Sequence, residues 1–253
     1  MAWPNIVFLI ITAVYILELV LTIFSGDDLN DFVFLGPPLS LLNTMGAKNP
    51  YEERYNWQLW RLATPLFLSV GFLHWIFNSV CILIVGFIVE GSKIGFVKMA
   101  IIFIVTGMGG YLMGSVCSDH AAVGLSPAVF GYVGAMIACV IVNWKALEPI
   151  GMMRVCLIFI LVLLLMMLLL YQTTMLTGNP NFTSSDMYSN FGGFIVGVCL
   201  GMMLMRPTRL QGRLQATSYE KKIFKIGGLL LLIYFILFIT LFYTVSEPRN
   251  LSY

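Results

Sequence analysis

Ser126 stands in the stretch AVGLSPAVFGYVGA, residues 121–134, between small residues at the start of an apolar run. A serine hydroxyl is a weak nucleophile unless a neighbouring base takes its proton, so a catalytic role requires a partner elsewhere in the chain. The pair Ser126–Pro127 is also typical of a helix N-terminus, because serine caps the first turn and proline lacks an N–H that would have no partner there. From this stretch alone, capping is the favoured interpretation.

Two further polar side chains lie inside an apolar stretch, FLHWIFNSV. His74 and Asn78 are four residues apart, so they share one face of a helix. Polar groups inside a membrane span are costly, face the protein interior and are candidates for function. A hydrogen bond between two packed helices is the alternative interpretation of this pair, and both interpretations stay open.

A third stretch, SNFGGFIVGVCLG, places a polar residue at the mouth of a row of glycines. Gly193 and Gly197 form a GxxxG pattern on one helix face, which lets another helix pack at close range. Asn190 lies one turn before Gly193 on nearly the same face. We expect Gly131 and Gly134 of the serine helix to pack against this row.

The elements that carry these residues are membrane helices. The chain of 253 residues is 59% hydrophobic and 10% charged, whereas a soluble domain has about a quarter of its residues charged. A spanning helix needs about 20 mostly apolar residues. Seven such spans are predicted, at 5–24, 66–89, 96–116, 121–143, 152–176, 187–205 and 226–245. The fold class is therefore an all-α polytopic membrane protein.

The spans divide the chain into four parts. Residues 1–205 form a core of six spans, in which the long segment 25–60 is expected on the outer side. Residues 206–225 form a basic inner linker, residues 226–245 a seventh span, and residues 246–253 an outer tail. The stretch WQLWRLATP, at 57–65, is aromatic and amphipathic and is suited to the membrane interface.

The distribution of charge predicts an orientation. With the N-terminus inside, the inner loops hold ten of the fourteen lysines and arginines and only three acidic residues. Because basic residues are enriched in cytoplasmic loops, this count favours an N-terminus inside and a C-terminus outside. The net charge of +2 gives no sign of nucleic-acid binding. Five scattered cysteines and two histidines form no metal-ligand pattern, so no metal or cofactor is expected.

The three polar stretches, together with WQLWRLATP, resemble the rhomboid family of intramembrane serine proteases over most of the chain. The matching positions, in chain order, are Trp60-Arg61 for the WR pair, His74-x-x-x-Asn78 for HxxxN, Glu90 for a frequent glutamate, Gly124-x-Ser126 for GxS, and Asn190-x-x-Gly193-x-x-x-Gly197 for HxxGxxxG. The resemblance implies a six-helix core, here followed by one extra helix in the 6+1 arrangement of secretase-type members.

The resemblance also implies roles for the matching residues. In the family the GxS serine attacks a peptide bond of a transmembrane substrate, the histidine of the sixth helix is the base, and the HxxxN pair helps to hold the oxyanion. Ser126 therefore matches the nucleophile position, and His74 with Asn78 matches the oxyanion positions. Gly131 belongs to the same helix as the serine, where small residues allow close packing.

Three positions depart from the family pattern. Ser69 stands where many members have another histidine, and Pro127 replaces the usual glycine after the serine. The graver change is Asn190 at the position of the catalytic histidine, because an amide has no useful basicity. Loss of such a partner typically lowers the rate by about 10⁴–10⁶.

Few other groups could replace the missing base. His120 is the one spare histidine and lies in a short loop six residues before Ser126. Every lysine except Lys48 falls in the predicted inner loops, so a serine–lysine pair is disfavoured. Asp186, one turn before Asn190, is expected to be a solvated carboxylate rather than a catalytic one.

The sequence therefore favours a rhomboid-like protein without catalytic activity that binds transmembrane segments of client proteins in trafficking or quality control. An active protease using Ser126 with an unusual base, and a structural subunit of a larger membrane complex, are the alternatives. The partners expected are the lipid bilayer and transmembrane proteins, and not nucleic acid. The secretory pathway or plasma membrane is the favoured location, and the mitochondrial inner membrane is possible.

Overall fold

Long apolar helices form this protein. The structure is a computed structural model that describes residues 2–26, 29, 35–91, 94–142, 182–183, 186–204, 218–245 and 247–248. Its longest helices are α1 (Trp3–Ser25), α4 (Phe72–Gly91), α5 (Phe96–Cys117), α6 (Ser126–Val142), α8 (Met187–Leu204) and α9 (Ser218–Thr244). Five of these six, all but α6, are long and apolar enough to cross a membrane. The prediction of an all-α polytopic membrane protein is confirmed.

The shortest of the six, α6, lies at the centre of the bundle. Its 17 residues span about 26 Å at 1.5 Å per residue, close to the thickness of a hydrocarbon core. Twelve of these residues are buried, because α4, α5 and α8 all pack against this helix. The span predicted at 152–176 lies outside the described residues.

Two helices begin later than their predicted spans. The span predicted to begin at 66 starts with η3 (Thr64–Phe67) and an extended Leu68, and α4 begins only at Phe72. The span predicted to begin at 121 starts with the strand β1 (Ala121–Ala122), and α6 begins at Ser126. The early apolar residues of both spans instead form a second buried cluster with residues of the first outer segment: Leu42, Ala47, Leu68, Val70, Ala121 and Val123.

The seventh predicted span shows the opposite difference. Helix α9 begins at Ser218, eight residues before the predicted start at 226. The end of the basic linker 206–225 is therefore helical, because lysine and glutamate are good helix formers. The span itself is apolar over Lys221–Thr244.

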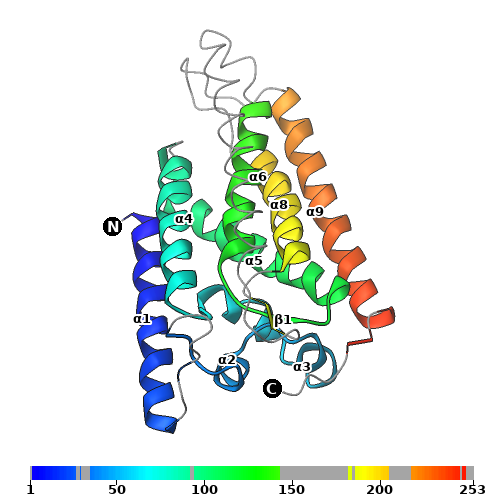
Figure 1. The fold of residues 1–253 in the computed structure, drawn as a ribbon. Helices are drawn as coiled ribbons and strands as arrows, with labels where there is room; N and C mark the ends of the chain where they lie inside the picture. The colour runs from blue at the N-terminus through cyan, green and yellow to red at the C-terminus, as the bar shows by residue number, and fades with distance from the viewer. Residues whose placement is uncertain are drawn as a thin grey trace.

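Short elements gather at one end of the bundle, where α1 ends and α4, α6 and α8 begin (Figure 1). They are α2 (Leu39–Met45), α3 (Pro50–Tyr55) and η2 (Leu59–Leu62). Strand β1 pairs in parallel with β2 (Phe182–Thr183), and on its other edge it forms an antiparallel bridge with Lys48. This end of the molecule therefore brings three distant parts of the chain next to the start of α6.

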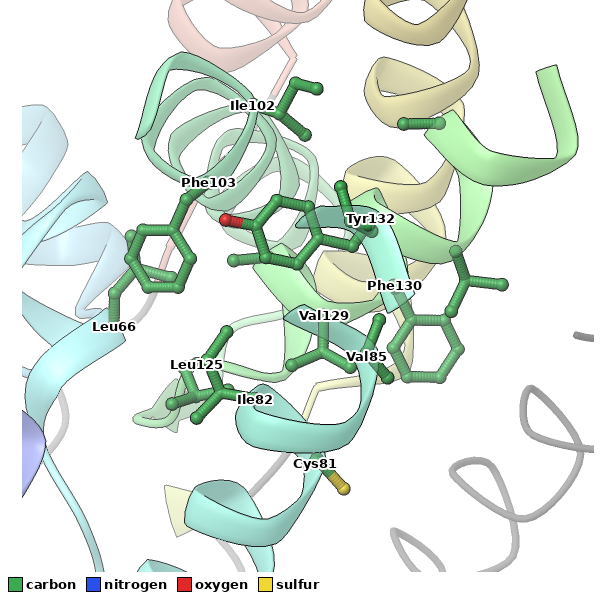
Figure 2. Packing of buried hydrophobic residues seen from close by; sticks show 14 of the residues in the cluster. Leu66, Cys81, Ile82, Val85, Ile102, Phe103, Leu125, Val129, Phe130 and Tyr132 are labelled. Carbon is green, nitrogen blue, oxygen red and sulfur yellow. The ribbon is translucent and has the colours of Figure 1, made fainter. Parts of the chain in front are cut away.

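The main core joins the helices around α6. Figure 2 shows Leu66 of η3 and Phe103 of α5 approaching Tyr132 of α6, while Ile82 of α4 lies near Leu125. The ring centroids of Phe103 and Tyr132 are 6.3 Å apart, and the Tyr132 hydroxyl donates to the carbonyl of Met99 at 3.1 Å. These contacts fix the height of α6 relative to α4 and α5.

Candidate functional site

Ser126 is the first residue of α6 and is half-buried. The carbonyl of Leu125 accepts hydrogen bonds from the N–H groups of Ala128 and Val129 at 3.0 and 3.2 Å, so Leu125 precedes the first helical residue. Ser126 and Pro127 therefore occupy the first two helical positions, one place later than the capping interpretation assumed. Proline is tolerated there because the first N–H groups of a helix have no intrahelical partner.

Gly124 holds the turn that leads into Ser126. Its φ of 125° lies in a region that favours glycine. Its N–H donates to the carbonyl of Pro65 at 2.8 Å, and its carbonyl accepts from the hydroxyl of Tyr111. The GxS glycine is therefore fixed from both sides, by η3 and by α5.

Glycines let α8 pack directly against the backbone of α6. A Cβ atom at Gly193 would overlap the carbonyl of Pro127, and one at Gly197 would overlap the carbonyl of Gly131. One at Gly134 would overlap the backbone of Phe194. The packing expected between the two glycine rows is present, and the two helices run in parallel with Gly193 level with Pro127.

This register places Asn190 beside the start of α6. Gly193 and Pro127 face each other near the start of the two helices. Asn190 lies three residues before Gly193 and Ser126 one residue before Pro127, so both polar residues lie at the same end of the seam between α6 and α8. Asn190 is 1% exposed, and its N–H donates to the carbonyl of Asp186 at 3.0 Å. Asn190 is therefore buried at the end of the seam where Ser126 begins α6.

His74 and Asn78 contact one another on α4. Nδ2 of Asn78 lies 2.9 Å from Nε2 of His74, and both side chains are buried. Asn78 lies one turn before Ile82, which belongs with Leu125 to the main buried cluster. The pair is therefore on the face of α4 that reaches the start of α6.

The residues of the WR pair point in opposite directions. Arg61 is buried, and its Nη1 donates to the carbonyls of Asn43 and Ala47 at 2.7 and 2.9 Å, while its Nε donates to Oε1 of Gln58 at 2.7 Å. Trp60 is 56% exposed. Arg61 therefore holds η2 against the backbone of residues 43–47, which directly precede Lys48.

Glu90 is not brought to this end of the bundle. It lies twelve residues after Asn78 on the same helix, which separates the two by about 18 Å along the axis. Glu90 is therefore not part of the arrangement around Ser126.

A buried ion pair that the sequence did not predict lies next to this arrangement. Nζ of Lys48 is 2.7 Å from Oδ2 of Asp186, and both side chains are almost fully buried. Asp186 also accepts from the hydroxyl of Ser189 at 2.9 Å and from the N–H of Tyr188 at 3.0 Å. The expectation that Asp186 is solvated is wrong, because this carboxylate anchors the first turn of α8.

The Lys48 ammonium keeps the buried Asp186 carboxyl ionised. Burial alone would raise the pKa of Asp186, but the Lys48 ammonium and the hydrogen bonds from Ser189 and Tyr188 bring it below its usual value. Gly114 of α5 leaves room for the pair, since a Cβ there would overlap Asp186 Oδ2 and lie 3.2 Å from Lys48 Nζ. Lys48 is thus held by a carboxylate, which makes its ammonium a poor candidate for a base.

His120 lies outside this buried region. Its side chain is exposed, and its backbone N–H donates to Oγ of Ser118 at 3.3 Å. The next two residues form β1, whose backbone is bonded to Lys48 on one edge and to β2 on the other. The loop therefore does not fold His120 over Ser126. Among the described residues, no group of three histidine, cysteine or acidic side chains could hold a metal ion.

Comparison with known proteins shows the family of this chain. The family model of the Rhomboid domain matches residues 56–207. RHOMBOID-like protein 7 of Arabidopsis thaliana is 30% identical over 72% of this chain and 54% of its own length. RHOMBOID-like protein 6, mitochondrial, of the same plant is 28% identical over 73% of this chain and 56% of its own length.

A third relative, Inactive RHOMBOID-like protein 8 of Arabidopsis thaliana, is 27% identical over 80% of this chain and 54% of its own length. The chain spans about half the length of these curated relatives. The matched domain covers more than half of the chain and includes α4, α5, α6 and α8. The chain belongs to the rhomboid family.

Proposed function

We propose that this rhomboid-family protein binds transmembrane segments of client proteins without cutting them, and acts in their trafficking or quality control. The observation that carries the proposal is the buried position of Asn190, at the end of the seam between α6 and α8 where Ser126 begins α6. In this proposal Ser126 is a nucleophile position, Asn190 replaces the base, and His74 with Asn78 occupies the oxyanion positions.

The chemistry of the neighbouring residues supports the absence of proteolysis. An asparagine amide cannot take the proton of a serine hydroxyl, and loss of a triad partner lowers the rate by about 10⁴–10⁶. Lys48 is engaged by Asp186 at 2.7 Å, and His120 is exposed. His74, the other histidine at this end of the bundle, contacts Asn78 at 2.9 Å, and no other lysine among the described residues lies there.

The strand next to Ser126 gives independent support. An extended peptide binds most simply by adding to a free strand edge. Ala122 of β1 exchanges backbone hydrogen bonds with Lys48 at 2.9 and 3.3 Å, and the other edge of β1 pairs with β2. A substrate chain would have to displace one of these partners before it could pair with the residues that precede Ser126.

Membership of the rhomboid family supports transmembrane segments as the clients of an inactive protein. The name of one relative says that it is inactive. A rhomboid fold without the base would still offer its membrane-embedded helices to another transmembrane segment. The same fold could serve as a subunit of a larger membrane complex, and copurification of a stoichiometric complex in place of varied clients would favour that role.

We also propose that the N-terminus lies inside and the C-terminus outside, in a membrane of the secretory pathway or in the plasma membrane. The excess of basic residues in the predicted inner loops supports this orientation. A mitochondrial inner membrane is the alternative, because the name of one relative includes the word mitochondrial. The proposed division is a six-span core to 205, a linker at 206–225, a seventh span at 226–245 and an outer tail at 246–253.

The test compares the purified protein with its Ser126→Ala and Asn190→His variants in proteoliposomes that hold a model transmembrane substrate. We expect wild-type protein to crosslink to the substrate without cleaving it, and to react with a fluorophosphonate probe no more than Ser126→Ala does. Labelling and cleavage that depend on Ser126 in the wild-type protein would overturn the proposal.

The Asn190→His variant tests the rest of the site. If cleavage appears in this variant and disappears again on adding Ser126→Ala, Asn190 alone accounts for the missing activity. Asn190→Gln is the matched control, because it changes the size of the side chain without supplying a base, and it should remain inactive.

A further inference from the structure

Glu18 carries a buried carboxyl group on α1, the first membrane helix. None of its side chain is exposed. Its Oε1 accepts a hydrogen bond at 3.1 Å from the backbone N–H of Ser69, which lies 51 residues later. Among the described residues, Oε2 has no hydrogen-bond partner. An ionisable group in a span is costly to retain, so the contact with Ser69 calls for a functional explanation.

Ser69 belongs to the short connection between η3 and α4, residues 68–71. The next backbone N–H, that of Val70, donates to Nδ1 of His74 at 3.4 Å. Two successive peptide groups are thus held by two side chains, Glu18 from α1 and His74 from α4. Because successive peptide planes share one Cα atom, a shift of the Ser69 N–H moves the Val70 N–H as well.

The packing of α1 against α4 reinforces this arrangement. Tyr15, one turn before Glu18, stacks on Trp75, with ring centroids 5.7 Å apart and planes 13° from parallel. Trp75 is the residue that follows His74. Helix α1 therefore contacts the chain on both sides of His74, through a ring on Trp75 and a carboxyl group on Ser69.

The hydrogen bond from Val70 determines which ring nitrogen of His74 carries the proton. A nitrogen that accepts a hydrogen bond is unprotonated, so the proton of a neutral ring lies on Nε2. The Nδ2 atom of Asn78 lies 2.9 Å from Nε2 and 3.3 Å from Nδ1, so the shorter of its two contacts is with Nε2. A half-turn of that amide exchanges its oxygen and nitrogen, which lets Oδ1 accept from the Nε2–H group.

We propose that Glu18 is a positioning residue for the His74–Asn78 pair. By holding the N–H of Ser69, it keeps the 68–71 connection where Val70 bonds to Nδ1, and so selects the tautomer whose Nε2–H faces Asn78. This role is independent of whether the protein cuts its clients or only binds them, because it concerns the state of the ring and not a reaction.

The chain has only two histidines, His74 and His120, so nitrogen spectroscopy can test the proposal directly. Protein labelled with ¹⁵N-histidine and held in nanodiscs gives two sets of ring signals, and the His120→Gln variant assigns them. In wild-type protein we expect His74 to show an unprotonated Nδ1 and a protonated Nε2. A proton on Nδ1 at neutral pH would overturn the proposal.

Variants of α1 separate the hydrogen bond from packing. Glu18→Leu removes the acceptor and should convert the single tautomer of His74 into a mixture, whereas the oxygen of Glu18→Gln accepts the same bond and should leave the signals unchanged. Ile11→Ala is the matched control, because Ile11 is 2% exposed and lies two turns earlier on the same face of α1.

Three outcomes count against the role of Glu18. They are unchanged His74 signals in Glu18→Leu, altered signals in Glu18→Gln, and an equal change in Ile11→Ala. If Glu18→Leu does not fold, Glu18→Met, an unbranched side chain that also lacks the acceptor, takes its place with the same expected result, and unchanged His74 signals in it would overturn the role of Glu18.

Discussion

An asparagine side chain can donate and accept hydrogen bonds in a buried place, but it cannot take up a proton at neutral pH. Asn190 is 1% exposed and lies at the same end of the seam between α6 and α8 as Ser126, so the position is polar but has no basicity. Such a substitution preserves the packing of α8 against α6 and removes the step that activates a serine. It is the single residue change on which the proposed loss of activity depends.

The ion pair between Lys48 and Asp186 allows a prediction about stability. Removing one partner of a buried pair leaves an uncompensated charge and costs about 3–5 kcal/mol, whereas replacing both partners by apolar residues costs much less. We therefore expect Lys48→Met alone to lower the free energy of unfolding by about that amount, and Lys48→Met with Asp186→Leu to lie closer to wild type. Unfolding in mixed detergent micelles measures both values.

Lys222→Met is the matched control for this comparison, because Lys222 is an exposed lysine of α9 and its loss should change stability little. If the double variant is less stable than either single variant, the two charges do not compensate each other. The pair would then not anchor α8 to the outer segment.

Residue pairs of this kind could not be predicted from the sequence. Lys48 and Asp186 are 138 residues apart, and no spacing or periodicity links them. The expectation of a solvated Asp186 followed from its place in an outer loop, where carboxylates usually face water. His74 and Asn78, by contrast, were predictable as neighbours because four residues bring two side chains together on any helix.

At the scale of elements, apolar length predicted the presence of the helices better than their starts. Leu68, Val70, Ala121 and Val123 are as apolar as the spans that follow them, yet they lie in the second buried cluster at the end of the bundle. The hydropathy of a sequence predicts which residues are buried, but it does not distinguish a helix from a packed loop. The positive φ of Gly124 and the bridge from Lys48 to Ala122 decide where α6 begins.

The close contact of α6 and α8 makes the stability of the protein sensitive to any side chain added at Gly197. A Cβ at Gly197 would overlap the carbonyl of Gly131, and backbone atoms cannot move aside as a side chain can. We expect Gly197→Ala to lower the free energy of unfolding by about 1–3 kcal/mol, the usual cost of overpacking. Unfolding in mixed micelles again provides the measurement.

Gly228→Ala is the matched control, since a Cβ there would lie 3.7 Å from Cε of Met203, an ordinary contact. Alanine is a better helix former than glycine by up to about 1 kcal/mol, so this variant should be as stable as wild type or more so. A Gly197→Ala variant as stable as Gly228→Ala would contradict the close packing of the two helices.

At the scale of the whole molecule, α9 is joined to the core along its length. The hydroxyl of Tyr234 donates to the carbonyl of Gly109 in α5 at 2.8 Å. At the far end of α9, Nη2 of Arg54 donates to the carbonyl of Tyr243 at 3.1 Å, and the rings of Trp57 and Tyr243 lie 5.6 Å apart. Figure 1 shows α9 beside α8, ending near α3. Helix α9 therefore contacts the outer segment as well as α5.

The orientation of the protein in the membrane can be tested at the two ends of the helix bundle. Cys117 is exposed at the end of α5, on the same side as α3 and Ser126, while Lys222 is exposed near the opposite end of the bundle. If the N-terminus is inside, a membrane-impermeant maleimide added to right-side-out vesicles, whose non-cytoplasmic side faces the medium, should label a variant whose one cysteine is Cys117. It should label a variant whose one cysteine is Lys222→Cys only after the membrane is permeabilised.

The reverse pattern would place the N-terminus outside, against the distribution of basic residues. Labelling of both positions in sealed membranes would mean a mixed orientation and would contradict the prediction equally. Because Ser126 lies at the same end as Cys117, the experiment also decides from which side of the membrane the buried seam between Ser126 and Asn190 can be reached. A client whose exposed segment lies on the outer side could then meet this site, and one exposed only on the inner side could not.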